Sequence, residues 1–574
     1  MLSEAKLDTK NEKRLQQALD YQKTHQVDKA LTLYQMILLD HPKHAMILHL
    51  IGITFAQIDN LEKAIVYFEN ALDIHPNHPI YTSSLANAQR RQGNTEQAIK
   101  TFEKAIDINP TLISAHNNLA LIYFKSNPEK ALSHLNTALE INPEHLDANY
   151  NMGIFLLPSN RHKAKKHLQR ALNTDPDFVP AMFQLAQIYH IEKAHINALN
   201  LYDKILDINP THPECLNKIG LIHLEQDNID DGIEFLKKAL SISSEITDIH
   251  HNLACCYLHK KEYQKALSHW MTHLKSNKDL DTYYNIGVCY LYLGRYDDCT
   301  DYLFHVIKKD PTHYESLINL GAAFLQKGHI ESACDYYQRA QSIKPTPSVQ
   351  YILSALEKKR EVSTVPAEYV IDLFNNYAFH YDNHLVDVLD YQVPKRLNSI
   401  LPALLNFSPN SLSCLDLGCG TGLAAVAIAP FKSHLTGVDL SPNMIEQANK
   451  KSIYDRLICQ DILIPISEYL NKTDLVLTAD TLPYFGDLNP VFSLVRTYLK
   501  PQGHWIFTIE TTRDECYVLN QSARFSHNPN TIKQLSKSHD FDIFHSENIQ
   551  LRTQQNQYIE GMIFILSAGL EKTN

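Results

Sequence analysis

The stretch Ser413-Cys414-Leu415-Asp416-Leu417-Gly418-Cys419-Gly420-Thr421-Gly422 decides the fold of the C-terminal part of this 574-residue chain. Its first half is apolar, as in a buried parallel strand, and glycines then occupy every second position. Glycine is needed where the backbone turns sharply and leaves a ligand no Cβ atom to meet. Residues 423–429 read as a helix whose first amides can hold a polar group. The pattern predicts a strand, a ligand-binding turn and a helix.

A second predicted strand covers 434–438 and ends in Asp439. In doubly wound folds, an acid at about this place binds ribose hydroxyls. A nicotinamide fingerprint G-x-G-x-x-G would need Gly or Ala at position 423, where the chain has Leu. The spacing therefore argues against a dinucleotide.

The pattern D-L-G-C-G-T-G at 416–422, followed by V-D-L-S at 438–441, closely resembles the class I S-adenosylmethionine-dependent methyltransferases. The resemblance covers roughly residues 370–567. It implies a Rossmann-like α/β domain, S-adenosyl-L-methionine as the cofactor and methyl transfer to an acceptor. It also implies that Asp461, after a third strand at 457–460, meets the adenine amino group.

The resemblance supplies most of the expected site residues. The expected cofactor-binding residues are Tyr377, Asp416, Gly418, Cys419, Gly420, Gly422, Asp439, Leu440, Asp461, Ile462 and Ala479. The candidate catalytic residues are Asp480, Tyr484 and His527. Asp480 follows a predicted strand at 474–478, at the rim where ligands bind in such sheets, and it is either a contact of the cofactor's amino group, a base or a loop-capping carboxylate.

The segment 374–384 looks like the lid of small-molecule-type methyltransferases, which implies that Tyr377 and Tyr381 cover the methionine end of the cofactor. Together with 389–394, 483–488 and 524–527, it resembles a bacterial group of repeat-fused methyltransferases. His380 and His384 are four residues apart, but no third ligand with convincing spacing follows, so we expect no metal. A strand at 504–510 brings Glu510 near the rim, and 541–549 with 558–566 predict a closing antiparallel hairpin.

The first 345 residues are repetitive. Prolines are spaced by 34, 34, 33, 33, 34, 101 and 34 residues, at positions 42, 76, 110, 143, 176, 210, 311 and 345. Small residues recur in step, as at Ala30, Ala64 and Ala98, where two helices approach closely. The array resembles about ten tetratricopeptide repeats, which implies an all-α superhelix whose groove takes a protein or peptide.

The predicted chain is therefore multidomain. Residues 1–345 form the repeat array, 346–371 a capping helix (349–359) and a linker (361–366), and 372–574 the methyltransferase domain. The short linker indicates a limited range of domain orientations.

The charge and apolar content of the chain limit the classes of partner that we expect. A formal net charge of −11 gives no field that attracts nucleic acid or anionic membranes, so neither is expected as a partner. No stretch approaches the ~20 apolar residues of a membrane helix, and the first residues lack the core of a secretory signal. We expect a soluble, cytoplasmic protein whose ten cysteines, none in a C-x-x-C pair, are reduced and buried.

The leading hypothesis is a methyltransferase whose repeats recruit a protein. Three alternative functions remain open. The first is a small-molecule methyltransferase whose repeats only localise or oligomerise it. The second is a non-catalytic scaffold with a degenerate, cofactor-sensing domain, which the intact glycines and Asp439 disfavour. The third, a repeat-fused glycosyltransferase, is disfavoured because the domain after the array has about 200 residues and a single nucleotide-type turn.

Overall fold

The computed structural model describes residues 7–244, 246–358, 362–379, 381–405, 407–514, 516–554 and 557–569. The chain divides into two compact units, Met1–Ser276 and Asn277–Asn574. The division falls inside the repeat array, so the last repeats belong to the same unit as the C-terminal sheet.

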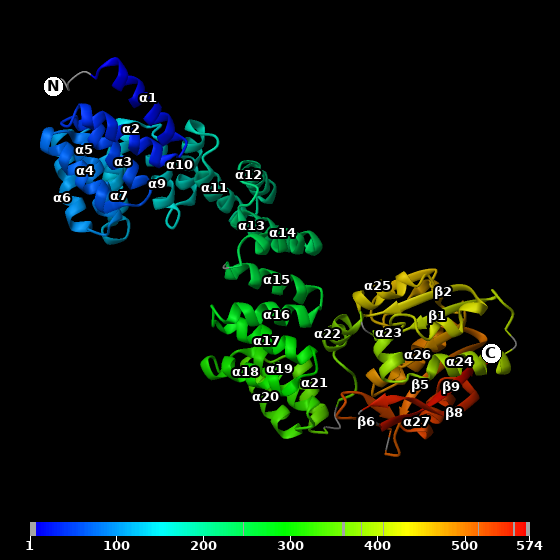
Figure 1. Ribbon diagram of the computed structural model, residues 1–574. Helices are drawn as coiled ribbons and strands as arrows, with labels where there is room; N and C mark the ends of the chain where they lie inside the picture. The colour runs from blue at the N-terminus through cyan, green and yellow to red at the C-terminus, as the bar shows by residue number, and fades with distance from the viewer. Residues whose placement is uncertain are drawn as a thin grey trace. The chain divides into compact units, whose positions relative to one another are not determined.

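The first unit consists of helices that pack two by two along the chain (Figure 1). In order they are α1 (Thr9–Lys23), α2 (Val27–Asp40), α3 (Ala45–Gln57), α4 (Leu61–Ile74), α5 (Pro79–Arg91), α6 (Thr95–Ile108), α7 (Ile113–Ser126), α8 (Pro128–Ile141), α9 (Leu146–Leu156), α10 (Arg161–Thr174), α11 (Val179–Ile191), α12 (His195–Ile208), α13 (Pro213–Glu225), α14 (Ile229–Ile242), α15 (Thr247–His259) and α16 (Tyr263–Leu274).

Small residues set the distance between paired helices, as their spacing in the sequence predicts. Ala64 and Ala98 are fully buried. A Cβ atom on Gly153 of α9 would lie 2.8 Å from Cγ of Leu168 in α10, so a larger residue would push this pair apart. The repeat prolines follow the second helix of each pair, where a residue without an N–H cannot continue the helix.

The second unit begins with further helices of the same kind. They are α17 (Leu280–Tyr292), α18 (Tyr296–Lys309), α19 (Tyr314–Gln326), α20 (Ile330–Ile343) and α21 (Pro347–Leu356). Val349 and Leu353 of α21 pack on Tyr337 of α20, so α21 covers the end of the array as predicted. The expected helix end at Lys359 and the first linker residue, Glu361, lie outside the described residues.

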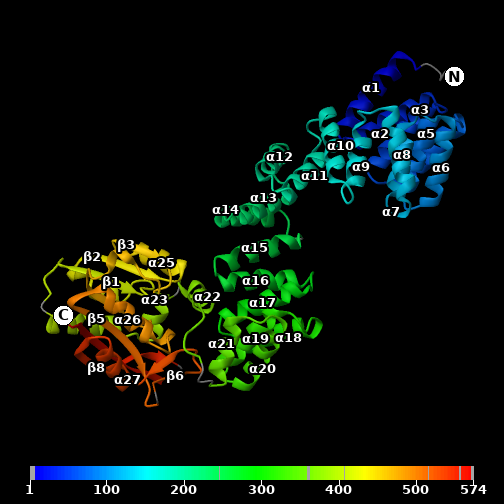
Figure 2. The same cartoon turned by 180° about the vertical axis from the view of Figure 1, so that it is seen from behind.

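The C-terminal part of this unit contains one nine-stranded sheet within the described residues (Figure 2). Its main order is β3-β2-β1-β4-β5-β7-β6; β9 pairs antiparallel with β5, and β8 with β9. The strands are β1 (Leu412–Leu417), β2 (Lys432–Asp439), β3 (Arg456–Cys459), β4 (Thr473–Thr478), β5 (Leu499–Thr511), β6 (Tyr517–Leu519), β7 (Phe525–His527), β8 (Phe541–Gln554) and β9 (Gln557–Ala568). The β8–β9 pair confirms the predicted closing hairpin.

Helices cover both faces of the sheet because alternate residues of each strand point to opposite faces. Leu415 of β1 packs in a core with Phe492 of α26, whereas its neighbour Cys414 packs in another with Leu397 of α24. The elements around the strands are α22 (Ala367–Tyr377), α23 (Tyr381–Asn383), the π-helix η1 (His384–Val388), α24 (Val393–Leu404), α25 (Pro442–Lys450), the 3-10 helices η4 (Ser467–Tyr469) and η5 (Leu482–Tyr484), α26 (Asn489–Tyr498) and α27 (Pro529–Ser538).

The α-helix predicted over 423–429 is wrong. The chain forms two short 3-10 helices there, η2 (Ala425–Ala427) and η3 (Ala429–Phe431). Pro430 disfavours the α conformation at Ala429, and β2 already begins at Lys432, so few residues remain for regular turns.

All ten cysteines are free thiols. The prediction that they are buried is wrong for Cys459 and Cys516, which are exposed. Among the described residues, no helix combines the length and the apolar character needed to cross a membrane.

Candidate active site

The glycine turn after β1 borders a cavity of about 210 Å³. Gly418, Gly420 and Gly422 have φ angles of 75°, 53° and 87°, a region that residues with a Cβ atom rarely adopt. A Cβ atom on Gly418 would lie 2.3 Å from Oγ1 of Thr481, whereas one on Gly420 would meet only the Tyr381 ring, at 4.0 Å. The turn therefore needs glycine, and the space over Gly420 is open toward the cavity.

Asp439 stands at the end of β2 and lines the cavity. Its Oδ2 accepts a hydrogen bond from the Gly420 amide at 2.8 Å, and its Oδ1 accepts one from the Ser441 amide at 2.9 Å. Burial raises the pKa of this carboxyl, and the two amide hydrogen bonds oppose that rise. Asp439 is thereby fixed beside the glycine turn.

The opposite wall follows β3. Asp461 lines the cavity and accepts a hydrogen bond from the Leu463 amide at 2.8 Å. Leu440, Ile462 and Ala479 line the cavity too, so these four predicted cofactor-binding residues come together with Asp439, Gly418 and Gly420.

Four predicted cofactor-binding residues are absent from the described lining: Tyr377, Asp416, Cys419 and Gly422. Asp416 is buried behind the turn, where its Oδ2 accepts a hydrogen bond from the Tyr454 hydroxyl at 2.7 Å, and burial raises its pKa to about 7. Gly422 faces the same Tyr454 ring. These residues support the turn from behind.

The lid segment covers the cavity through α22 and α23. Phe374 and Tyr381 line it, whereas the Tyr377 hydroxyl contacts His384 Nδ1. Asn375 holds the lid to the start of α25, because its Oδ1 accepts from the Ser441 hydroxyl at 2.7 Å and its carbonyl from Asn443 Nδ2 at 3.0 Å. His380, the first member of the His380–His384 pair, lies outside the described residues.

The residues predicted as a linker also belong to the cavity. Thr364 and Val365 line it, as does Val370 of α22 just after the linker, and Thr364 forms a β-bridge with Phe485. Composition and chain position suggest only a connector here, so this part of the lining was not predictable.

A buried group of four charged side chains, the Arg–acid network, lies beside the catalytic candidates. It consists of Asp480, Glu510, Arg524 and Arg552. Oδ1 of Asp480 accepts from Arg524 at 2.6 Å and from Arg552 at 3.2 Å, and Oε1 of Glu510 accepts from the same arginines at 2.7 and 2.6 Å. Two acids thus balance two guanidinium groups.

The Arg–acid network holds the rim of the cavity. Asp480 and Tyr484 line the cavity, and the Tyr484 hydroxyl accepts a hydrogen bond from Arg524 at 2.7 Å. Asp480 has a φ angle of 56°, an uncommon conformation for aspartate that is found at functional sites. Burial alone would raise the pKa of Glu510, but the two guanidinium groups outweigh it and hold that pKa below its usual range.

His527, the third catalytic candidate, is not among the described residues that line the cavity. It is buried in β7, where its Nε2 donates to the Phe485 carbonyl at 2.8 Å. Burial lowers its pKa to about 4, so the ring is neutral near pH 7. The histidine supports the loop that carries Tyr484 and Phe485.

A second, larger cavity of about 1210 Å³ adjoins the first at Tyr484. Helices α19 to α21 supply one side of it, and β5, β7, β9 and the β6–β7 turn supply the other, including Glu510 and Arg524. The Tyr351 hydroxyl of α21 donates to the Ala523 carbonyl at 2.8 Å, next to Arg524. The end of the repeat array therefore forms part of the surroundings of the rim.

Family models match two parts of the chain. A "Methyltransferase domain" model matches residues 415–507. "Tetratricopeptide repeat" models match 15–79, 179–212, 213–246, 280–313 and 314–347, and a "TPR repeat" model matches 86–127. Tetratricopeptide repeats are joined in this chain to a class I methyltransferase domain. The domain's glycine turn, Asp439 and Asp461 all lie within the matched range.

Several relatives match this methyltransferase domain. The chain is 35% identical over 139 residues to a malonyl-[acyl-carrier protein] O-methyltransferase of Priestia megaterium, which covers 24% of this chain and 48% of that protein. It is 38% identical over 88 residues to human methyltransferase-like protein 27, and this match covers 15% of this chain and 36% of that protein. It is 33% identical over 121 residues to sterol 4-C-methyltransferase strm-1 of Caenorhabditis elegans, and this match covers 20% of this chain and 35% of that protein. The chain spans less than half the length of each of these relatives.

Proposed function

We propose that this methyltransferase uses S-adenosyl-L-methionine and that its repeat array binds a protein or peptide, which either is methylated or recruits the enzyme. One observation carries the cofactor assignment. Two fixed carboxylates, Asp439 and Asp461, and the bare backbone of Gly418 and Gly420 border a single cavity. This set suits a ligand with sugar hydroxyls, an amino-bearing base and a cationic end.

Each part of the cavity has a proposed role. Asp439 would hold the ribose hydroxyls, Asp461 and Ile462 the adenine, and Asp480 the amino group. The bound cofactor supplies a methyl group activated by a sulfonium. The protein therefore needs no covalent catalyst, and its side chains position two reactants and exclude water.

The lid and the rim perform that positioning. Asn375 connects α22 to the start of α25 through its hydrogen bond with Ser441, and Asp382 forms an ion pair with Lys451 at 2.5 Å. The segment over the cavity is therefore held at two points. At the rim, burial raises the pKa of Tyr484, which keeps its hydroxyl protonated. This hydroxyl accepts from Arg524 and has its own proton left to donate to an acceptor.

The larger cavity beside Tyr484 supports a macromolecular acceptor. It is open to the end of the repeats and gives room for a side chain or a carried group to approach the rim. The relative from Priestia megaterium acts, by its name, on a malonyl group held by a carrier protein. An acceptor presented by a protein would fit both the repeats and this cavity.

A small-molecule acceptor is the second candidate. Phe374 and Tyr381 of the lid line the cofactor cavity, and the name of the Caenorhabditis elegans relative describes a sterol substrate. In this case the repeats would only localise or oligomerise the enzyme.

The first test is calorimetric titration of S-adenosylmethionine and S-adenosylhomocysteine into the full chain. Asp439→Ala and Asp461→Asn should each weaken binding about 10-fold or more, because hydrogen bonds to charged groups contribute about 1.5–3 kcal/mol. Asp542→Ala, which removes an exposed carboxylate of β8 in the same domain, should bind like the wild type. No binding by a folded wild type would refute the cofactor assignment and favour a scaffold.

The second test separates the two acceptor classes. A cell extract incubated with the enzyme and a labelled methyl donor is divided into macromolecules and small molecules. Label on a protein that the repeats also retain supports the leading proposal, and label confined to small molecules supports the second candidate. The Asp439→Ala variant gives the background.

A further inference from the structure

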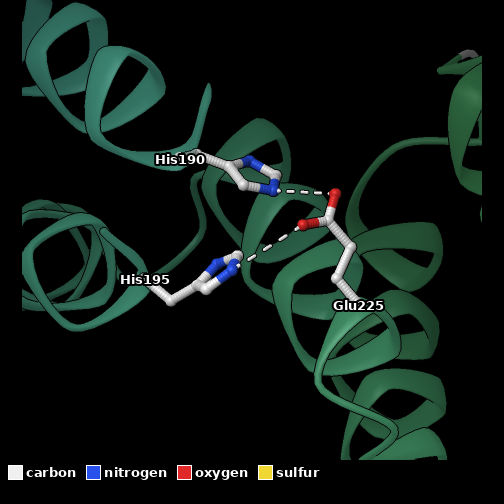
Figure 3. Close-up of side chains that lie close together, drawn as sticks. All are labelled: His190, His195 and Glu225. Carbon is white, nitrogen blue, oxygen red and sulfur yellow. Dashed lines mark ion pairs between the residues drawn. The ribbon is translucent and has the colours of Figure 1, made fainter. Parts of the chain in front are cut away.

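Two histidines and a glutamate meet in the first unit, far along the chain from the methyltransferase domain. His190 lies in the last turn of α11, His195 is the first residue of α12 and Glu225 is the last residue of α13. Figure 3 shows both rings turned toward the carboxylate, each facing a different oxygen. Nε2 of His190 is 3.2 Å from Oε1, and Nε2 of His195 is 4.0 Å from Oε2. One nitrogen or oxygen of each residue lies within 4.8 Å of those of the other two.

The polar atoms of this group are incompletely satisfied. Nδ1 of His195 is buried and makes no hydrogen bond to any described residue, and Nε2 of His190 has only the Glu225 carboxylate, at 3.2 Å. Buried nitrogen atoms of this kind normally have a partner, so Nδ1 of His195 calls for an explanation.

The repeat architecture does not require these histidines. In later repeats, the position of His190 holds leucine (Leu224, Leu258, Leu291 and Leu325). The position of His195 holds large apolar or aromatic residues (Ile229, Tyr263, Tyr296 and Ile330). Helix pairing is thus achieved with apolar residues at both positions, and a separate reason for the histidines is needed.

Two neutral imidazoles and one carboxylate are a ligand set for late first-row metals rather than for Mg²⁺ or Ca²⁺. Ligand distances of about 2.0–2.2 Å in a tetrahedral site place ligand atoms about 3.3–3.5 Å apart. The separation of 3.2 Å matches, and the separation of 4.0 Å would close with a small shift of the His195 ring. We propose that His190, His195 and Glu225 bind a divalent transition metal of the Zn²⁺ type and so clamp two successive repeats together.

Lys193 competes with the proposed metal ion for the carboxylate of Glu225. Its Nζ is 2.9 Å from Oε2 of Glu225, on a side chain that is 69% exposed. The positive charge of this ammonium group also opposes a cation bound beside it. Removal of the lysine should therefore tighten metal binding.

The test uses the full chain, stripped with a chelator and titrated with ZnCl₂ in a calorimeter. Wild type should bind one equivalent of Zn²⁺. Glu225→Gln and His195→Gln should each lower the affinity for this ion about 10-fold or more, since even outer-shell changes at metal sites cost about 10–100-fold in affinity. The matched control is His259→Gln, which removes the one histidine of the neighbouring His259–Asp227 pair and should leave this equivalent unchanged. Lys193→Gln should bind more tightly than wild type.

A thermal melt separates loss of the site from loss of the fold. Metal-free Glu225→Gln should melt as one folded protein, and Zn²⁺ should raise the Tm of wild type but not of this variant. Equal Zn²⁺ stoichiometry and affinity in wild type, Glu225→Gln and His259→Gln would overturn the proposal, because the ion would then bind scattered surface histidines.

Discussion

The proposed cofactor side of the cavity and the proposed acceptor side draw on different parts of the chain. The cofactor side uses backbone amides and carboxylates at the ends of β1, β2 and β3, which follow one another closely in sequence. The acceptor side uses the Arg–acid network, whose members Arg524 and Arg552 lie 44 and 72 residues from Asp480. The first side depends on the shape of one turn, and the second depends on charge balance in a buried place.

The largest effect should come from breaking the charge balance. Arg552→Met leaves Asp480 and Glu510 with one guanidinium, and loss of one partner from a buried ion pair costs about 3–5 kcal/mol. Urea unfolding followed by circular dichroism measures this free energy. Lys165→Met removes a cation from the exposed Lys165–Glu192 pair and should cost less than about 1 kcal/mol. An equal loss of unfolding free energy in the two variants would show that the buried network stabilises the fold no more than an exposed ion pair does.

The next effect concerns the shape of the glycine turn. Gly418→Ala should destabilise the fold by roughly 2–4 kcal/mol, since a strained φ costs about 1–3 kcal/mol and overlap with Thr481 adds about 1 kcal/mol or more. Gly93→Ala is the control, because Gly93 has a φ of 94° but nothing within 4 Å of its Cβ position. The difference between the two unfolding free energies isolates the overlap, and no difference would contradict it.

A pH dependence should follow from Asp416. Its folded pKa of about 7 lies above the unfolded value of about 3.9, so the folded state binds the proton more tightly. Its contribution to stability is present at low pH and is lost as the pH rises from about 4 to about 7, at about 1.4 kcal/mol per pH unit. Asp416→Asn should lack this slope. Parallel stability curves for wild type and variant would show that the carboxyl is ionised throughout.

The smallest effect tests whether the two sides are independent. Tyr484→Phe removes the hydroxyl that accepts from Arg524 and should cost about 0.5–1.5 kcal/mol of stability. It should reduce methyl transfer while leaving the affinity for S-adenosylmethionine unchanged. Tyr498→Phe, which removes an acceptor of the Ile466 amide away from the cavity, should cost similar stability without loss of activity. A weaker cofactor affinity in Tyr484→Phe alone would show that the sides are coupled.

The same contrast explains what the sequence could predict. Gly418, Asp439 and Asp461 are predictable because each directly follows a predicted strand, Gly420 follows in the same turn, and parallel strands deliver their ends to one edge of the sheet. Arg552 is not predictable in this way. The register of β8 against β9 shifts between Gln550 and Arg552, and this irregularity breaks the alternation that assigns inward and outward residues.

Local sequence also misleads where neighbours in space decide the structure. The residues after the glycine turn have helical composition, but Pro430 and the start of β2 leave room only for 3-10 turns. Thr364 and Val365 read as a connector, yet they form a wall of the cavity because Thr364 pairs with Phe485. Only the second error reflects a contact between distant segments, whereas the first follows from Pro430, which the sequence itself contains.

The hydrogen bond from Tyr351 to Ala523 affects which fragments of this chain can keep the structure of the cavity. The residue after Ala523 is Arg524, so the position of one guanidinium depends on a helix that belongs to the end of the repeats. A fragment that begins at residue 372 would keep the glycine turn and its acids but lose α21, Thr364 and Val365. The methyltransferase domain from residue 372 onward therefore depends on the residues before it, because Thr364 and Val365 line its cavity and α21 holds the chain next to Arg524.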